Sequence, residues 1–104
     1  MTDTNYIGSI VKILETPTQK FFNNNISVTK VRVQLPQVRK TKILNLIFWG
    51  KLAHDVANYY KTNDYILIEG YLSLAYQQTS KKVEITVLKV YPFLLSYNRS
   101  LSQA

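Results

Sequence analysis

The sequence predicts an all-β fold, a small barrel of five strands with one short helix between the third and fourth strands. Two observations carry this prediction. Apolar and polar residues alternate with a period of two over most of the chain, which is the pattern of half-buried strands. One segment changes to helical spacing instead. The length of 104 residues is typical of a single domain.

Five segments have the alternation or the β-branched and aromatic composition of strands: 6–14, 26–35, 42–49, 65–74 and 82–91. In the second of them, Val31 and Val33 alternate with Lys30 and Arg32. Alternation of this kind places apolar side chains on one face of a strand and polar side chains on the other. Segments rich in Asn, Thr, Pro and Gln separate the strands and are expected to form turns.

Residues 51–61 interrupt the alternation with apolar residues at helical spacing, including Leu52 and Val56. The order of three strands, one helix and two strands is that of an OB-fold barrel. We therefore predict an OB-fold domain over residues 1–95. The polar segment 96–104 is expected to form a flexible tail.

The composition excludes most enzyme classes. The chain has no Cys, so disulfides, thiol nucleophiles and Cys-ligated zinc are ruled out. Its six carboxylates are scattered along the chain, and its one His, His54, has no second His or Cys nearby. Neither a pair of catalytic acids nor a metal site is apparent. We expect a protein that is not an enzyme and that needs no cofactor and no metal.

The charge and hydropathy indicate where the protein acts. Thirteen Lys and Arg residues against six Asp and Glu give a formal net charge of +7, which attracts polyanions such as nucleic acid, an anionic membrane or an acidic protein. No apolar run approaches the about 18 residues that a membrane span needs, and no export signal is visible. We expect no membrane association and a location in a bacterial cytoplasm or in the stroma of a plastid that encodes the protein.

The positive charge is concentrated between Glu15 and Asp55, an interval without acidic residues. Its cations are Lys20, Lys30, Arg32, Arg39, Lys40, Lys42 and Lys51. We expect Lys30 and Arg32 on one face of the second strand, with the next three cations on the adjoining loop and the third strand. On an OB fold this face binds oligonucleotides, and cations on it neutralise phosphates. The alternative is an ordinary solvated face.

Five aromatic residues are candidates for stacking on bases, an interaction worth roughly 1–3 kcal/mol per base. Trp49 ends the third strand, and Phe21 and Phe22 follow Lys20 in the first connection. Tyr71 is expected to face outward from the fourth strand, and Tyr76 lies near the last hairpin. For each, the alternative is a role in packing. Phe48 is expected in the core, because it is out of phase with Trp49.

Two segments, 48–53 (FWGKLA) and 65–72 (YILIEGYL), resemble the bacterial single-stranded DNA-binding protein family, above all its short, tail-less cyanobacterial and plastid members. The resemblance implies an OB fold, a homo-oligomer (tetramer or dimer) and binding of single-stranded DNA without regard to sequence. Such proteins protect exposed strands in DNA replication, recombination or repair. Trp49 occupies the position of a base-stacking aromatic in the family.

The chain also departs from that family. A Trp-His pair of the family is replaced by Ile43-Leu44, and a hairpin Trp by Gln77. These changes predict that fewer bases stack on aromatic side chains and that electrostatic attraction contributes more of the binding energy. The sequence shows no counterpart of the acidic tail that recruits replication proteins in the family. Replication proteins are therefore only possible partners. The alternative is a primosome-type or other OB-fold protein-interaction module with weak DNA or RNA binding, because the OB face does not by itself discriminate between the two sugars.

Overall fold

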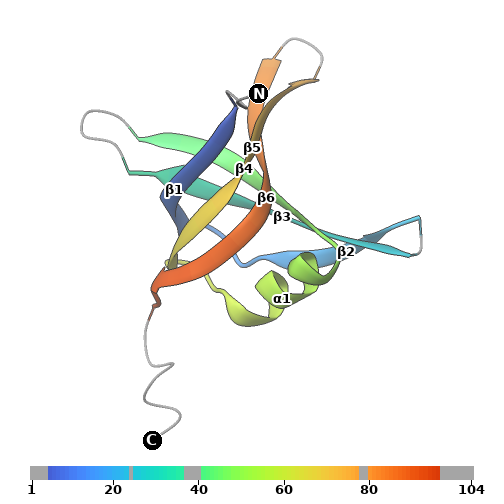
Figure 1. Cartoon of the computed structure of the whole chain (residues 1–104), viewed down its shortest axis with the longest axis horizontal. Coiled ribbons are helices and arrows are strands. Elements are labelled where there is room, and N and C mark those ends of the chain that lie inside the picture. The colour runs from blue at the N-terminus through green and yellow to red at the C-terminus, as the bar shows by residue number, and fades with distance from the viewer. Residues whose placement is uncertain (1–4, 24, 37–40, 78–79, 97–104) are drawn as a thin grey trace, which may run out of the picture.

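A computed structural model describes residues 5–23, 25–36, 41–77 and 80–96, with the side chains of 74–82 left out (Figure 1). Within these ranges, the elements are β1 (Tyr6–Ile13), β2 (Thr18–Phe22), β3 (Ile26–Leu35), β4 (Lys42–Trp49), α1 (Lys51–Tyr59), β5 (Tyr65–Gln77) and β6 (Ser80–Leu94). None of the helices in the described ranges has the length and apolarity to span a bilayer.

Five of these strands close into a barrel, which confirms the predicted OB fold. The strands follow the order β1-β5-β6-β4-β3, and β3 returns to β1 through pairs at Lys12 and Ile13. The pairing of β4 with β6 is parallel, whereas the other pairings are antiparallel. The single helix lies between β4 and β5 in the chain, as predicted.

One strand, β2, lies outside the five-stranded barrel, in a segment that was expected to be an irregular connection. Instead it pairs along its whole length with β3 and forms a hairpin that projects beyond the barrel (Figure 1). Asn23 turns the chain between the two strands with φ 52°, a conformation that Asn adopts more easily than most residues. The hairpin widens the outer surface of the barrel next to β3 and β4.

The last two strands are longer than the expected 65–74 and 82–91. Their antiparallel pairing continues without a further shift from Tyr71–Thr86 to Gln77–Ser80. Near the middle of β5, a Cβ atom at Gly70 would overlap the backbone carbonyl of Thr86. The backbone of β6 leaves no room for a side chain at this position, which lies next to a shift in the register of the two strands, so a glycine is required there.

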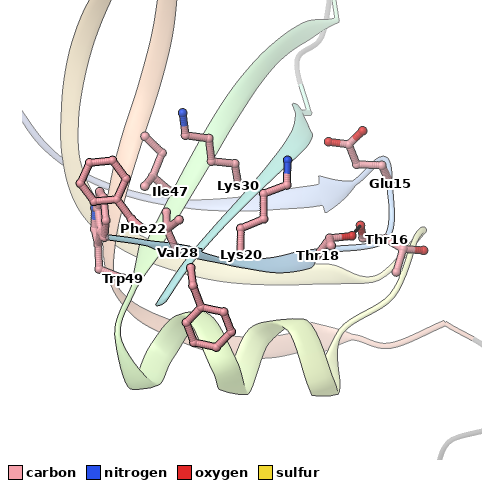
Figure 2. A pocket seen from close by; sticks show the side chains of 10 residues that line it. Glu15, Thr16, Thr18, Lys20, Phe22, Val28, Lys30, Ile47 and Trp49 are labelled. Atoms are coloured by element: carbon pink, nitrogen blue, oxygen red, sulfur yellow. Dashed lines mark hydrogen bonds between the residues drawn. The ribbon is translucent and has the colours of Figure 1, made fainter. Parts of the chain in front are cut away.

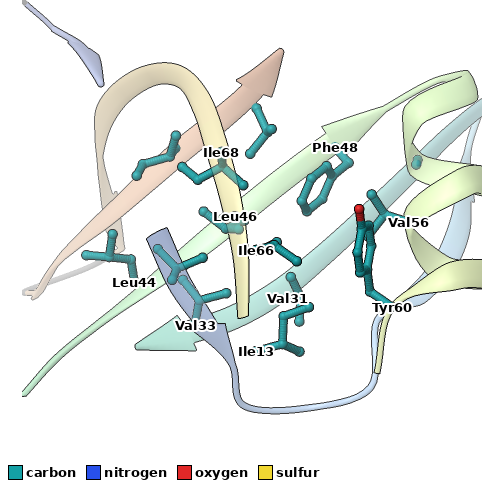
Figure 3. Close-up of a cluster of buried hydrophobic side chains, with 14 residues drawn as sticks. Ile13, Val31, Val33, Leu44, Leu46, Phe48, Val56, Tyr60, Ile66 and Ile68 are labelled. Atoms are coloured by element: carbon teal, nitrogen blue, oxygen red, sulfur yellow. The ribbon is translucent and has the colours of Figure 1, made fainter. Parts of the chain in front are cut away.

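The core fills the barrel with side chains from alternate positions of the strands (Figure 3). Its fourteen buried residues are Val11, Ile13, Val31, Val33, Leu44, Leu46, Phe48, Ala53, Val56, Tyr60, Ile66, Ile68, Ile85 and Val87. Phe48 is fully buried, as expected. The helix covers one end of the barrel, and the Thr29 hydroxyl donates a hydrogen bond of 2.8 Å to the Ala53 carbonyl.

The buried residue Asp64, in the connection between α1 and β5, joins three segments of the chain. Asp64 is fully buried and accepts hydrogen bonds from the backbone N–H groups of Lys61, at 2.8 Å, and Ser96, at 2.7 Å. Its own carbonyl accepts a bond from the N–H of Ile13 at 2.8 Å. Ser96 was expected in the flexible tail but is held to the barrel, and the rest of that tail lies outside the described residues.

Candidate nucleic-acid interface

An open groove of about 640 Å³ crosses the outer face of β2, β3 and β4 (Figure 2). It is lined by Glu15, Thr16, Thr18, Lys20, Phe21, Phe22, Val28, Lys30, Ile47 and Trp49. The strand register explains why these residues meet: Lys30 lies opposite Thr18 on β2 and Ile47 on β4. Since side chains two apart on a strand share a face, alternate residues of three adjacent strands supply most of the lining of the groove.

Aromatic rings form one end of the groove. Trp49 is 45% exposed at the end of β4, and Phe22 meets it edge to face, with ring centroids 6.4 Å apart and an interplanar angle of 81°. Val28 pairs with Trp49 in the register and forms part of the floor. A half-exposed indole supported by a second ring offers a flat surface on which a base can stack.

Two lysines occupy the middle of the groove. Lys20 and Lys30 are exposed, and Figure 2 shows their side chains extending from adjacent strands to the same side of the floor. Within the described part of the chain, neither ammonium group forms an ion pair. Their charge is therefore available to an anion, and it lies next to the aromatic end.

An acidic residue lies at the opposite end of the groove. Glu15 accepts a hydrogen bond from the backbone N–H of Arg32 at 3.0 Å, and its second oxygen accepts one from Arg32 Nε at 3.3 Å. Arg32 shares the outer face of β3 with Lys30, as predicted, because Val31 and Val33 point into the core. Its charge, however, is already paired with a carboxylate that the sequence analysis did not assign to the site.

Two further predicted cations, Lys42 and Lys51, do not line the groove. Lys51 lies in the first turn of α1, where it pairs with Asp55 at 3.2 Å. Lys42 begins β4 and so lies at the opposite end of that strand from Trp49. Arg39 and Lys40 fall outside the described residues.

The predicted aromatic residues also divide. Phe21 is 65% exposed and borders the groove. Tyr71 instead packs edge to face on Tyr6, with centroids 5.2 Å apart, on the outer face of β1 and β5. The Tyr6 hydroxyl donates to Glu69 Oε1 at 2.7 Å, and this bond raises the pKa of Tyr6. Tyr76 belongs to β5, but its side chain is outside the description.

Lys20 and Phe22 were expected in a connection between strands, whereas the structure places both in the groove. The missing information was the strand β2: once Thr18–Phe22 is a strand, the alternation places Thr18, Lys20 and Phe22 on one face. Within the described ranges, no group of three His, Cys, Asp or Glu side chains is placed to hold a metal ion. The groove offers stacking and charge.

Comparison with known proteins agrees with this geometry. No family model matches the chain. A protein of Trieres chinensis named "Putative single-stranded DNA-binding protein ycf41" is 41% identical in an alignment that covers 88% of this chain and 90% of the relative.

Two solved structures share the fold. One is the SSB domain of a Synechococcus protein, with a TM-score of 0.75, 23% identity and coverage of 88% of this chain and 98% of that domain. The other is the second single-stranded DNA-binding protein of Mycobacterium smegmatis, with a TM-score of 0.70, 22% identity and coverage of 96% and 92% of the two chains.

Proposed function

The chain belongs to the single-stranded DNA-binding protein family, and from that premise we propose that its groove binds single-stranded DNA without regard to sequence. The observation that carries the proposal is the position of Trp49 and Phe22 beside Lys20 and Lys30, whose charges are unpaired within the described residues. Family members bind DNA and are not enzymes, in agreement with the expectation from the sequence.

The chemistry of the groove explains the type of ligand. Every base has a π-face that can stack on Trp49, so stacking tolerates any sequence. Lys20 and Lys30 attract phosphates, which are the same at every nucleotide. A base in a duplex is already stacked on its neighbours, so a single strand uses the aromatic end of the groove better than a duplex does.

The first test is a titration of the protein with an oligo-dT while Trp49 fluorescence is recorded. Since the chain has a single Trp, quenching reports contact at the groove. Each phosphate contact on a single strand contributes about −0.7 to the slope of log affinity against log salt. Two lysines therefore predict a slope of about −1.4 or steeper, which corresponds to a loss of roughly sevenfold between 50 and 200 mM salt.

The same titration distinguishes the competing functions. A duplex of equal length serves as the control and should bind more weakly than oligo-dT. Absence of quenching and of binding at low salt would contradict the proposal and favour a protein-interaction module. Equal binding of oligo-U and oligo-dT would extend the ligand to RNA.

We further propose that the protein protects exposed strands in DNA replication, recombination or repair, and that replication proteins are its partners. This role would place it where the DNA is, in a bacterial cytoplasm or a plastid stroma. Family membership and the unpaired lysines of the groove support the proposal. It predicts that the protein and single-stranded DNA are recovered together after crosslinking in cells.

We also propose that the protein forms a homo-oligomer through β1 and the adjoining outer sheet face. In the described part of β1, Tyr6–Val11 pair with β5 along one edge, whereas β3 reaches only Lys12 and Ile13 on the other. An unpaired strand edge is a template for a second strand. Next to it lie Ile10, Leu67 and Tyr91, which are paired neighbours on three strands.

A charge on this face tests the oligomer. Tyr91→Glu should lower the molar mass measured by light scattering after gel filtration, because a carboxylate in an apolar interface is costly. Tyr59→Glu is the matched control, because Tyr59 on α1 is 47% exposed and Tyr91 is 46% exposed. The molar mass of the Tyr59→Glu variant should equal that of the parent protein. A parent protein of monomeric mass at micromolar concentration would refute the oligomer.

A further inference from the structure

We propose that Glu15 is a built-in counter-charge that keeps Arg32 out of the DNA contact and sets an upper limit to the affinity of the groove. The inference rests on the proposed function and concerns how that function is tuned. It follows from the ion pair at the end of the groove, where a predicted DNA-binding cation is occupied by an acid.

Arg32 would otherwise continue the line of cations in the groove. It follows Lys30 by two residues on the same outer face of β3, so the two Cα atoms are separated by about 6.6 Å along the strand. A strand of DNA that reaches Lys30 from the aromatic end therefore has Arg32 as its next cation. The carboxylate of Glu15 lies at that next position and repels a phosphate there.

The carboxylate is held in place independently of the guanidinium. One oxygen accepts the backbone N–H of Arg32 at 3.0 Å, and the Leu14 N–H donates to the Arg32 carbonyl at 3.0 Å. These bonds fix the chain before Glu15 to β3. Even if the guanidinium turned toward a phosphate, a negative charge would remain beside it, so Arg32 cannot act as an unscreened cation.

A purely stabilising role for this ion pair is the competing explanation. The side chains of Arg32 and Glu15 are 57% and 42% exposed, and exposed pairs contribute little to stability. The hydrogen bonds to the backbone of Arg32 already attach the connection after β1. Stability therefore does not require the charge on Glu15, whereas its position in a basic groove matters directly for a polyanion.

The test is Glu15→Gln, which removes the charge but keeps an oxygen that can accept the N–H of Arg32. We expect the affinity for labelled oligo-dT at 50 mM salt, measured by anisotropy, to rise by about three- to tenfold. The reason is that two unit charges in contact in water interact with about 1 kcal/mol, and this repulsion between Glu15 and a phosphate is removed. The slope of log affinity against log salt should become steeper by about 0.7, because Arg32 gains a phosphate. Asp55→Asn is the matched control: it makes the same charge change and frees Lys51 outside the groove.

A double-mutant comparison isolates the role of Arg32. In the parent protein, Arg32→Gln should weaken binding, because it leaves the Glu15 carboxylate without its counter-charge beside the groove. In the Glu15→Gln background, Arg32→Gln should abolish the gain. The inference is overturned if Glu15→Gln binds no better than Asp55→Asn, or if the gain of Glu15→Gln persists when Arg32→Gln is added to it. A parent protein that does not bind oligo-dT at low salt would instead refute the proposed function.

Discussion

Replacing Asp64 with Ala is expected to lower the free energy of unfolding by about 2–6 kcal/mol, because two partly buried N–H donors lose their acceptor and each loss costs about 1–3 kcal/mol. The donors are the backbone groups of Lys61 and Ser96, at 2.8 and 2.7 Å from the carboxylate. A domain of this size is stable by only about 5–15 kcal/mol. Urea denaturation followed by circular dichroism measures the loss.

Two further variants test the cause. Asp64→Asn should be almost as harmful, because the donors face different carboxylate oxygens and the amide presents an N–H₂ group to one of them. Asp55→Ala is the control: its partner is exposed Lys51, and the change should cost no more than about 1 kcal/mol. If Asp64→Asn is as stable as the parent, the two hydrogen bonds do not explain the burial of this residue.

Trp49→Ala is expected to weaken the binding of single-stranded DNA by about five- to 150-fold, the equivalent of roughly 1–3 kcal/mol of base stacking. The indole has Phe22 on one side and is 45% exposed, so its removal takes away a supported platform. Because the variant has no Trp, anisotropy of a labelled oligo-dT is the measurement. Trp49→Phe keeps a ring and should retain most of the affinity.

The control for this prediction is Tyr59→Ala. Tyr59 exposes 47% of its surface, nearly the same fraction as Trp49, but lies on α1 and is absent from the lining of the groove. It should leave the affinity unchanged. Unchanged binding by Trp49→Ala, with a native circular dichroism spectrum, would show that the groove binds by charge alone.

Local periodicity predicted most of the fold. The bounds 26–35 and 42–49 were predicted as the structure has them for β3 and β4, because both strands bury one face and so alternate cleanly. The sequence did not reveal β2, since its residues are almost all exposed and carry no apolar alternation. The ends of β5 and β6 were missed for a related reason: cross-strand pairing extends them, and pairing partners are not visible in a single segment.

The site shows the same division. Local sequence pattern was enough to predict the OB topology, the outward direction of Lys30 and Arg32, and the burial of Phe48 beside exposed Trp49, because side chains alternate along a strand whatever its neighbours are. Which of these groups meet depends on the tertiary structure. It brought Phe22 to Trp49, placed Glu15 on Arg32, and separated Lys42, Lys51 and Tyr71 from the groove. Contacts between strands depend on register and closure, which involve residues distant in the chain.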